Sequence, residues 1–218
     1  MLINIHCAKC VGIDAIPVIV EVDVATGIGI HLVGLADAAI KESLLRIVTS
    51  LQTLGFRIPG RKIVINLAPA DMHKKGSGYD LPIALGIIAA SAQRDLPLLD
   101  KFLIMGELGL DGTIREVPGA LPTVELAAKR GMMGCILPRQ SALEASEYNI
   151  IDVYGVETME EVLEILSGEV AREDLLARNI RTGARTGAGQ GISGAMDFSE
   201  KGFQKAGEME NFLPAVHK

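Results

Sequence analysis

Hydrophobic and polar residues along the first half of the chain alternate with the periods of strands and helices. Every second residue from Ile16 to Val24 is apolar, which predicts a strand with one buried face. A glycine turn follows, so the next apolar segment is expected to pair with this strand. The elements predicted here are strands at residues 15–24, 30–33 and 62–67, and helices at residues 37–54, with Asp37 as N-cap, and 81–91.

The second half of the chain continues this alternation with shorter segments. The Asp-Gly pair at 111–112 is a hairpin signal. Ser141 with Glu144, and Thr158 with Glu161, have the spacing of capping boxes at helix starts. Further strands are predicted at residues 102–105, 113–117, 135–137 and 151–154, and helices at residues 120–130, 141 onward and 158–168. Strands and helices that alternate without strict β-α-β order favour an α/β (α+β) fold with a mixed sheet.

The same pattern divides the chain into a domain and a tail. Apolar periodicity ends near Gly168, and residues 169–180 are rich in charge. Residues 181–194 are rich in glycine and nearly free of large apolar side chains, which is typical of a flexible linker. We therefore expect one domain at 1–168, a linker at 169–196 and a tail without fixed structure at 197–218.

Composition narrows the functional classes. The chain has 218 residues, of which 49% are hydrophobic, and its net charge of −6 argues against a strong nonspecific grip on nucleic acid. No apolar run reaches the roughly 18 residues that a membrane helix needs. The N-terminal residues lack the pattern of a signal peptide. A cytoplasmic protein without membrane contact is expected.

Cofactor and metal motifs are incomplete. Cys7 and Cys10 form a lone C-x-x-C without the second ligand pair that zinc needs, and Cys135 is predicted to lie in an apolar strand, so reduced thiols are expected. Residues 189–194 satisfy G-x-G-x-x-G, but no strand precedes them, as a dinucleotide site requires. The chain contains no G-x-x-x-x-G-K-[ST] segment. No metal and no cofactor, ATP included, is therefore expected for this chain.

The segment 66–86 is the best candidate for function. It joins a short apolar strand to a helix that is apolar almost all round, and such a helix is buried. The polar loop between them is thus anchored to the core at both ends, where rigid scaffolds present functional groups. Asp80 is expected to cap the helix. The candidate contact loop comprises Asp71, His73, Lys74, Lys75, Gly76, Ser77, Gly78 and Asp80.

Two chemical interpretations of this loop remain open. Ser77 could be a nucleophile with Asp80 or His73 as its base, or an ordinary residue of a loop before a helix. A local basic cluster could contact phosphate or an acidic subunit, or be a solvated surface; it comprises Arg57, Arg61, Lys62, His73, Lys74 and Lys75. Glu107, at the end of a predicted strand, is interpreted as structural.

Three longer segments suggest a family. Residues 33–43 (VGLADAAIKES), 65–91 and 105–122 resemble the N-terminal domain of the magnesium-chelatase-like AAA+ proteins of bacteria, the ComM/YifB family linked to DNA transformation and branch migration. The resemblance implies a two-layer fold like that of the Lon protease domain and of a ribosomal-protein domain. It also implies a hexameric ring in the whole protein, possible DNA contact, and ATP and Mg bound by a separate ATPase module.

The resemblance to Lon tests the protease interpretation. The catalytic serine position of Lon-type proteases aligns with Gly78, and the catalytic lysine position aligns with Leu121. A shift of one residue could restore Ser77 but no lysine, since the nearest is Lys129. The fold is therefore expected to serve as a non-proteolytic module.

The tail limits what the chain is expected to do. Residues 197–200 resemble the start of the AAA+ module. The sequence after Glu200 no longer matches that module and contains neither the Walker A nor the Walker B motif. We expect a motorless chain from a truncated gene, with a non-catalytic role in ring assembly or DNA guidance. The alternative is a stand-alone hydrolase centred on Ser77.

Overall fold

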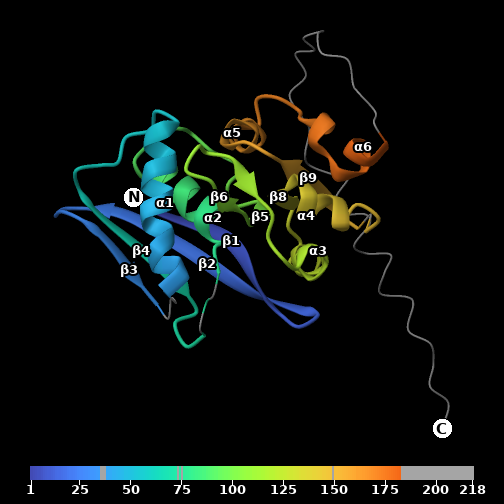
Figure 1. The fold of residues 1–218 in the computed structure, drawn as a ribbon, viewed down its shortest axis with the longest axis horizontal. Coiled ribbons are helices and arrows are strands. Elements are labelled where there is room, and N and C mark those ends of the chain that lie inside the picture. Colours follow the sequence, from blue (N-terminus) through green and yellow to red (C-terminus); the bar gives the residue numbers. More distant parts are fainter. Residues whose placement is uncertain (35–37, 73, 75, 149, 183–218) are drawn as a thin grey trace. The chain divides into compact units, whose positions relative to one another are not determined.

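A seven-stranded mixed sheet organises the computed structural model, which describes residues 1–34, 38–72, 74, 76–148 and 150–182 (Figure 1). In sheet order the strands are β3 (Ile30–Val33), β4 (Lys62–Ala68), β2 (Asp14–Ala25), β1 (Leu2–Val11), β5 (Phe102–Ile104), β8 (Gly134–Pro138) and β9 (Asp152–Val156). The pairs β1/β2 and β2/β4 are antiparallel, and the other neighbours are parallel. The predicted α/β fold with a mixed sheet is confirmed.

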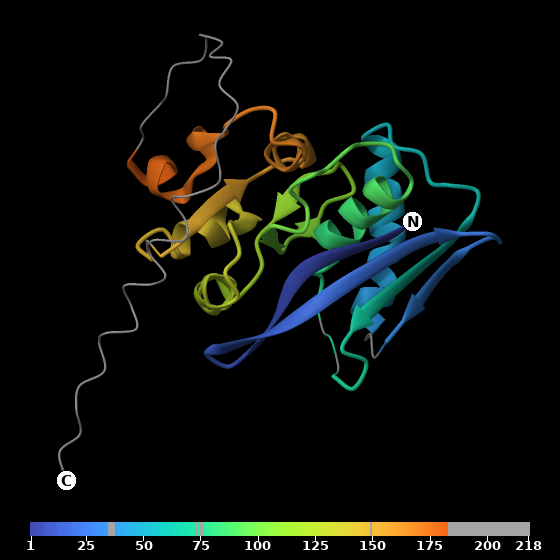
Figure 2. The same ribbon diagram turned by 180° about the vertical axis from the view of Figure 1, so that it is seen from behind.

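Helices pack on this sheet and on one another. The helices are α1 (Ala38–Thr53), α2 (Asp80–Ala90), α3 (Ala120–Lys129), α4 (Arg139–Glu144), α5 (Met159–Ser167), a 3-10 turn η1 (Glu173–Leu175) and α6 (Ala177–Thr182). Every residue of α2 is buried, because α2 packs against β1 and β2 on one side and against α1 on the other (Figure 2). The apolar pattern had predicted this burial.

Local signals predicted several elements correctly. A small hairpin of β6 (Glu107–Leu108) and β7 (Ile114–Arg115) forms around the Asp-Gly turn. Thr158 accepts a hydrogen bond from the Glu161 amide, and the Glu161 carboxylate accepts one from the Thr158 amide at 3.0 Å, so the predicted capping box is present. Gly168 ends α5 in the left-handed conformation, with φ 69°.

Two predictions of local structure were wrong, and one strand was missed. β3 pairs with β4 and not with β2, because β4 lies between them. Ser141 does not cap α4: Pro138 occupies the N-cap position, and the Ser141 hydroxyl donates to the Val117 carbonyl and accepts from the Val117 amide. β1 was missed: apolar and polar residues alternate from Ile3 to Cys7, but the alternation ends at Ala8, in the middle of the strand.

The segment that follows α5 is helical in part. Residues 169–182, whose charged sequence was compatible with a helix within the predicted linker, include η1 and α6. Leu176 forms a bridge with Tyr154 of β9, and Leu175 and Ala177 are buried. The domain therefore extends past Gly168. The rest of the predicted linker and the tail, residues 183–218, and the Asp37 N-cap lie outside the described residues.

Candidate contact loop and neighbouring carboxylates

Main-chain hydrogen bonds fix the end of the candidate contact loop, residues 71–80, to the strand end beside it. The Gly106 amide donates to the Gly78 carbonyl, and the Leu81 amide donates to the Gly106 carbonyl, each at 3.0 Å. The Asp80 amide donates to the Ser77 carbonyl at 3.0 Å. The sequence from Ser77 to Leu81 is thus held against the segment between β5 and β6. This contact brings two chain regions some thirty residues apart into one site.

Asp80 connects three elements from inside the protein. Its side chain is 0% exposed and accepts hydrogen bonds from Arg46 Nε at 2.8 Å and from the Leu108 amide at 3.3 Å. Burial raises the pKa of Asp80 in spite of these bonds. The expected capping role is wrong, because Asp80 is the first residue of α2 and its N-cap, Tyr79, forms no side-chain capping bond. A buried carboxylate cannot contact a partner, so Asp80 is not part of a contact surface.

Lys74 is also buried. Its side chain is 0% exposed, and its ammonium donates to the Pro69 carbonyl. Burial lowers the pKa of Lys74, Lys9 lowers it further and Asp71 raises it. The proposed use of Lys74 as a surface charge is therefore incorrect. His73 and Lys75 lie outside the described residues.

Ser77 bonds to a carboxylate that sequence reasoning had not paired with it. Its hydroxyl donates to Glu107 Oε2. The other oxygen of Glu107 lies 3.7 Å from Arg115 Nη1. Of the two predicted bases for Ser77, Asp80 is paired with Arg46 instead. The only sequence signal for the Ser77–Glu107 pair was a carboxylate at the end of a strand.

The remaining residues of the loop fall into two groups. Asp71 and Gly76 are exposed, and Gly76 has φ 87°, a backbone conformation that favours glycine. Gly78 instead packs internally: a Cβ atom there would lie 2.9 Å from Met105 Cε. The backbone of a partner therefore has no room to approach at Gly78, whereas Gly76 is exposed.

The predicted basic cluster does not gather at this loop. Arg57 and Arg61 are exposed and precede β4, whereas the contact loop follows its last residue. β4 begins at Lys62, so the full length of this strand separates Arg57, Arg61 and Lys62 from Lys74 along the chain. Leu121, at the position that the Lon resemblance assigns to a lysine, is 42% exposed in the first turn of α3.

Other chemical sites are sparse. The described side chains include no group of three or more His, Cys, Asp and Glu placed to bind one metal ion. Burial raises the pKa of the Cys7 and Cys135 thiols, so these thiols are unreactive. Among the described helices, none has both the length and the hydropathy that a bilayer crossing requires.

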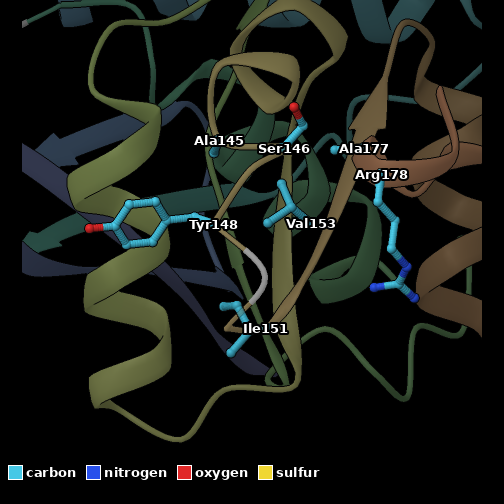
Figure 3. A pocket seen from close by; sticks show the side chains of 7 residues that line it. All are labelled: Ala145, Ser146, Tyr148, Ile151, Val153, Ala177 and Arg178. Atoms are coloured by element: carbon cyan, nitrogen blue, oxygen red, sulfur yellow. The ribbon is translucent and has the colours of Figure 1, made fainter. Parts of the chain in front are cut away.

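A shallow depression lies between the segment that follows α4, the strand β9 and the start of α6 (Figure 3). Its cavity volume of about 10 Å³ is close to the size of one water molecule and far below the roughly 300–1,000 Å³ of small-molecule sites. Two of its polar side chains are already paired: Tyr148 donates to Glu125 at 3.0 Å, and Arg178 donates to Asp152 at 2.5 Å. The depression is therefore an ordinary irregularity of the surface and does not have the features of a catalytic site.

Comparisons with known proteins agree with the fold. Residues 20–141 match the family model described as the ChlI subunit of Mg-chelatase. Competence protein ComM of Haemophilus influenzae is 37% identical over 166 residues, which cover 76% of this chain and 32% of ComM. YifB of Escherichia coli is 41% identical over 128 residues, or 58% of this chain and 25% of YifB. An archaeal Lon protease of Thermococcus kodakarensis is 29% identical over 111 residues, 49% of this chain and 17% of that protein. The chain thus spans about a third, or less, of these relatives.

Proposed function

We propose a function from one premise: the chain belongs to the family of the ChlI subunit of Mg-chelatase, and ComM and YifB are among its relatives. Its role is that of a non-catalytic N-terminal domain of a ComM/YifB-type protein, whose ATP chemistry occurs in another module. In the cytoplasm, such a protein would act on DNA during competence or recombination. The observation that carries the non-catalytic assignment is Leu121, an apolar and 42% exposed residue at the position that the Lon resemblance assigns to the catalytic lysine.

A nucleophilic serine needs a base within hydrogen-bond reach that can take its proton. The Ser77 hydroxyl donates to Glu107, whose carboxylate also lies beside Arg115. The Lys74 ammonium is buried on the Pro69 carbonyl, and Leu121 replaces the lysine of the Lon arrangement. These contacts support a structural role for Ser77, which joins the contact loop to β6.

A fluorophosphonate probe for activated serines tests this assignment. We expect no labelling of the chain, because the Ser77 hydroxyl donates to a carboxylate that also lies beside Arg115, and among the described residues no amine or imidazole is hydrogen-bonded to it. An active Lon-type protease serves as the positive control, and Ser77→Ala serves as the matched negative control. Labelling that disappears in Ser77→Ala would establish the hydrolase alternative and overturn the non-catalytic one.

Within the non-catalytic role, the surface chemistry favours ring assembly over DNA guidance. The chain has a net charge of −6. The Lys74 side chain is buried, so its charge is not exposed on the surface of the contact loop. Affinity for DNA comes largely from cations that displace counterions from phosphates. An acidic domain whose loop does not expose that lysine is better suited to contact other subunits than DNA. The contact would involve the exposed part of the loop at Asp71 and Gly76.

Two solution measurements separate ring assembly from DNA guidance. We expect the weight-average sedimentation coefficient of the chain to rise with protein concentration. Fluorescence anisotropy of a labelled four-way DNA junction is expected to stay unchanged at low salt when the chain is added. An anisotropy increase that weakens steeply with added salt would instead identify a DNA contact and contradict the preference for assembly.

A further inference from the structure

The two edges of the seven-stranded sheet are not equivalent. At one edge, β9 is covered by the segment that follows α5: Tyr154 forms a bridge with Leu176, and Asp152 pairs with Arg178. At the other edge lies β3, at the outer border of the sheet in both ribbon views (Figures 1 and 2). Within the described ranges, only β4 pairs with β3. One side of β3 is therefore available to another strand.

The sequence around β3 lacks the charged residues and proline that protect many sheet edges. Natural proteins prevent pairing of edge strands with another chain by short strand length, charged residues, proline or a bulge, and of these β3 has the short length. Residues 24–36 contain no Asp, Glu, Lys, Arg or Pro, although 22% of the chain is charged. Copies of this acidic chain can thus approach one another at β3 without charge repulsion between the strands.

The hydrogen-bonding groups of β3 are complementary to a second β3. The Ile63 amide donates to the Gly29 carbonyl at 2.9 Å, and Ile30 lies beside Ile63 in the parallel register. Alternate residues of a parallel ladder direct their main-chain groups to the same neighbour. His31 therefore faces β4, and Ile30 and Leu32 face outward. In an antiparallel pair centred on His31, each outward Ile30 lies opposite the outward Leu32 of the other copy.

The side chains of β3 suit the same arrangement. Ile30 and Leu32 pack against the core, so pairing would continue the apolar layer from one copy into the next. His31 is exposed on the opposite face, beside Val64 of β4. The charged groups nearest on that face are Asp23, opposite Val64, and Lys62. At the centre of the pair the two His31 side chains would adjoin each other.

We propose that β3 pairs antiparallel with β3 of a second copy of this chain, about a two-fold axis at His31. Two four-residue strands bury little surface, so the contact belongs to the small, weak class below about 1,200 Å² and depends on protein concentration. A two-fold contact joins identical surfaces, whereas a ring joins unlike surfaces. The strand pair is thus independent of the proposed ring contact, and either can fail alone.

Cysteine cross-linking tests the register. Residues opposite each other in a non-hydrogen-bonded antiparallel pair have Cα atoms about 4.5 Å apart, within the range that a disulfide spans. His31→Cys is therefore expected to form a covalent dimer rapidly under a mild oxidant. Val33→Cys is the matched control, because Val33 would lie opposite Gly29 and not opposite its own copy. Cross-linking of neither variant, or of Val33→Cys as fast as His31→Cys, would overturn the proposal.

A charge variant tests the contact without added oxidant. His31→Lys places two like charges side by side at the axis, and we expect the association constant from sedimentation to fall about fivefold. Asn4→Lys adds the same charge to β1, an interior strand, and is expected to leave association unchanged. Equal behaviour of both variants, or a wild-type chain that stays monomeric at all concentrations, would contradict β3 pairing.

Discussion

Arg46→Met is expected to lower the free energy of unfolding by about 3–5 kcal/mol at neutral pH, because it leaves a buried carboxylate without its cation. Asp80 is 0% exposed, and its Oδ2 accepts from Arg46 Nε at 2.8 Å. Its Oδ1 has no hydrogen-bond partner among the described residues. Most of the compensation for burying this charge therefore comes from Arg46. Methionine keeps much of the length and packing of arginine, so the loss of stability reports on the missing guanidinium charge and not on packing.

The defect of Arg46→Met should depend on pH. Burial already raises the folded-state pKa of Asp80 above its unfolded value, and loss of Arg46 raises it further. A carboxyl with a raised folded pKa contributes stability that is fully present below its unfolded pKa of about 3.9 and is lost as pH rises through the folded pKa. The difference between variant and wild type should therefore be smaller near pH 4 than at pH 7, as measured by urea unfolding.

Two control variants make this prediction specific. Arg139→Met removes a cation from a pair with Glu157 that is 44% and 59% exposed, and its cost should stay within about 1 kcal/mol. Asp80→Asn combined with Arg46→Met removes both charges and should recover much of the loss. If Arg46→Met costs no more than Arg139→Met, or if Asp80→Asn restores nothing, the buried carboxylate is not the cause.

The elements that sequence predicted correctly depend on neighbours along the chain. The capping box at Thr158 spans three residues, and the burial of α2 follows from the composition of one helix. Such signals are local, so periodicity and capping chemistry suffice to find them. The pairing of β3 is different, because its partner β4 comes after a whole helix and the intervening sequence does not specify the order of strands.

The partners of the side chains in the candidate site could not be predicted from sequence for the same physical reason. Asp80 has the residue type and position of a helix cap, but its partner Arg46 lies 34 residues earlier. Ser77 has its partner Glu107 30 residues later. Lys74 looks like a surface charge until the fold buries it on the Pro69 carbonyl. Residue types alone therefore did not show which side chains of residues 71–80 are buried, or which distant residues they contact.

Gly86→Ala is expected to destabilise the domain by about 2 kcal/mol, although alanine is the better helix former by about 1 kcal/mol. α2 crosses the sheet at Gly86, where an added Cβ would lie 2.4 Å from Val22 Cγ2 and 3.0 Å from Ile5 Cδ1. Val22 is β-branched and fully buried, so its side chain cannot rotate away without a further clash. Urea unfolding followed by circular dichroism measures the loss.

A matched glycine and a compensating variant separate this clash from a general effect of alanine. Gly60→Ala meets no atom within 4 Å and should change the free energy of unfolding by less than about 0.5 kcal/mol. Val22→Ala removes the methyl groups that the new Cβ would strike, so it should cost clearly less in the Gly86→Ala background than in the wild type. Strictly additive losses would show that α2 and β2 accommodate the methyl group elsewhere. Coupled losses would instead show that contact of the new methyl group with Val22 causes the loss of stability, and hence that α2 needs glycine where it crosses β2.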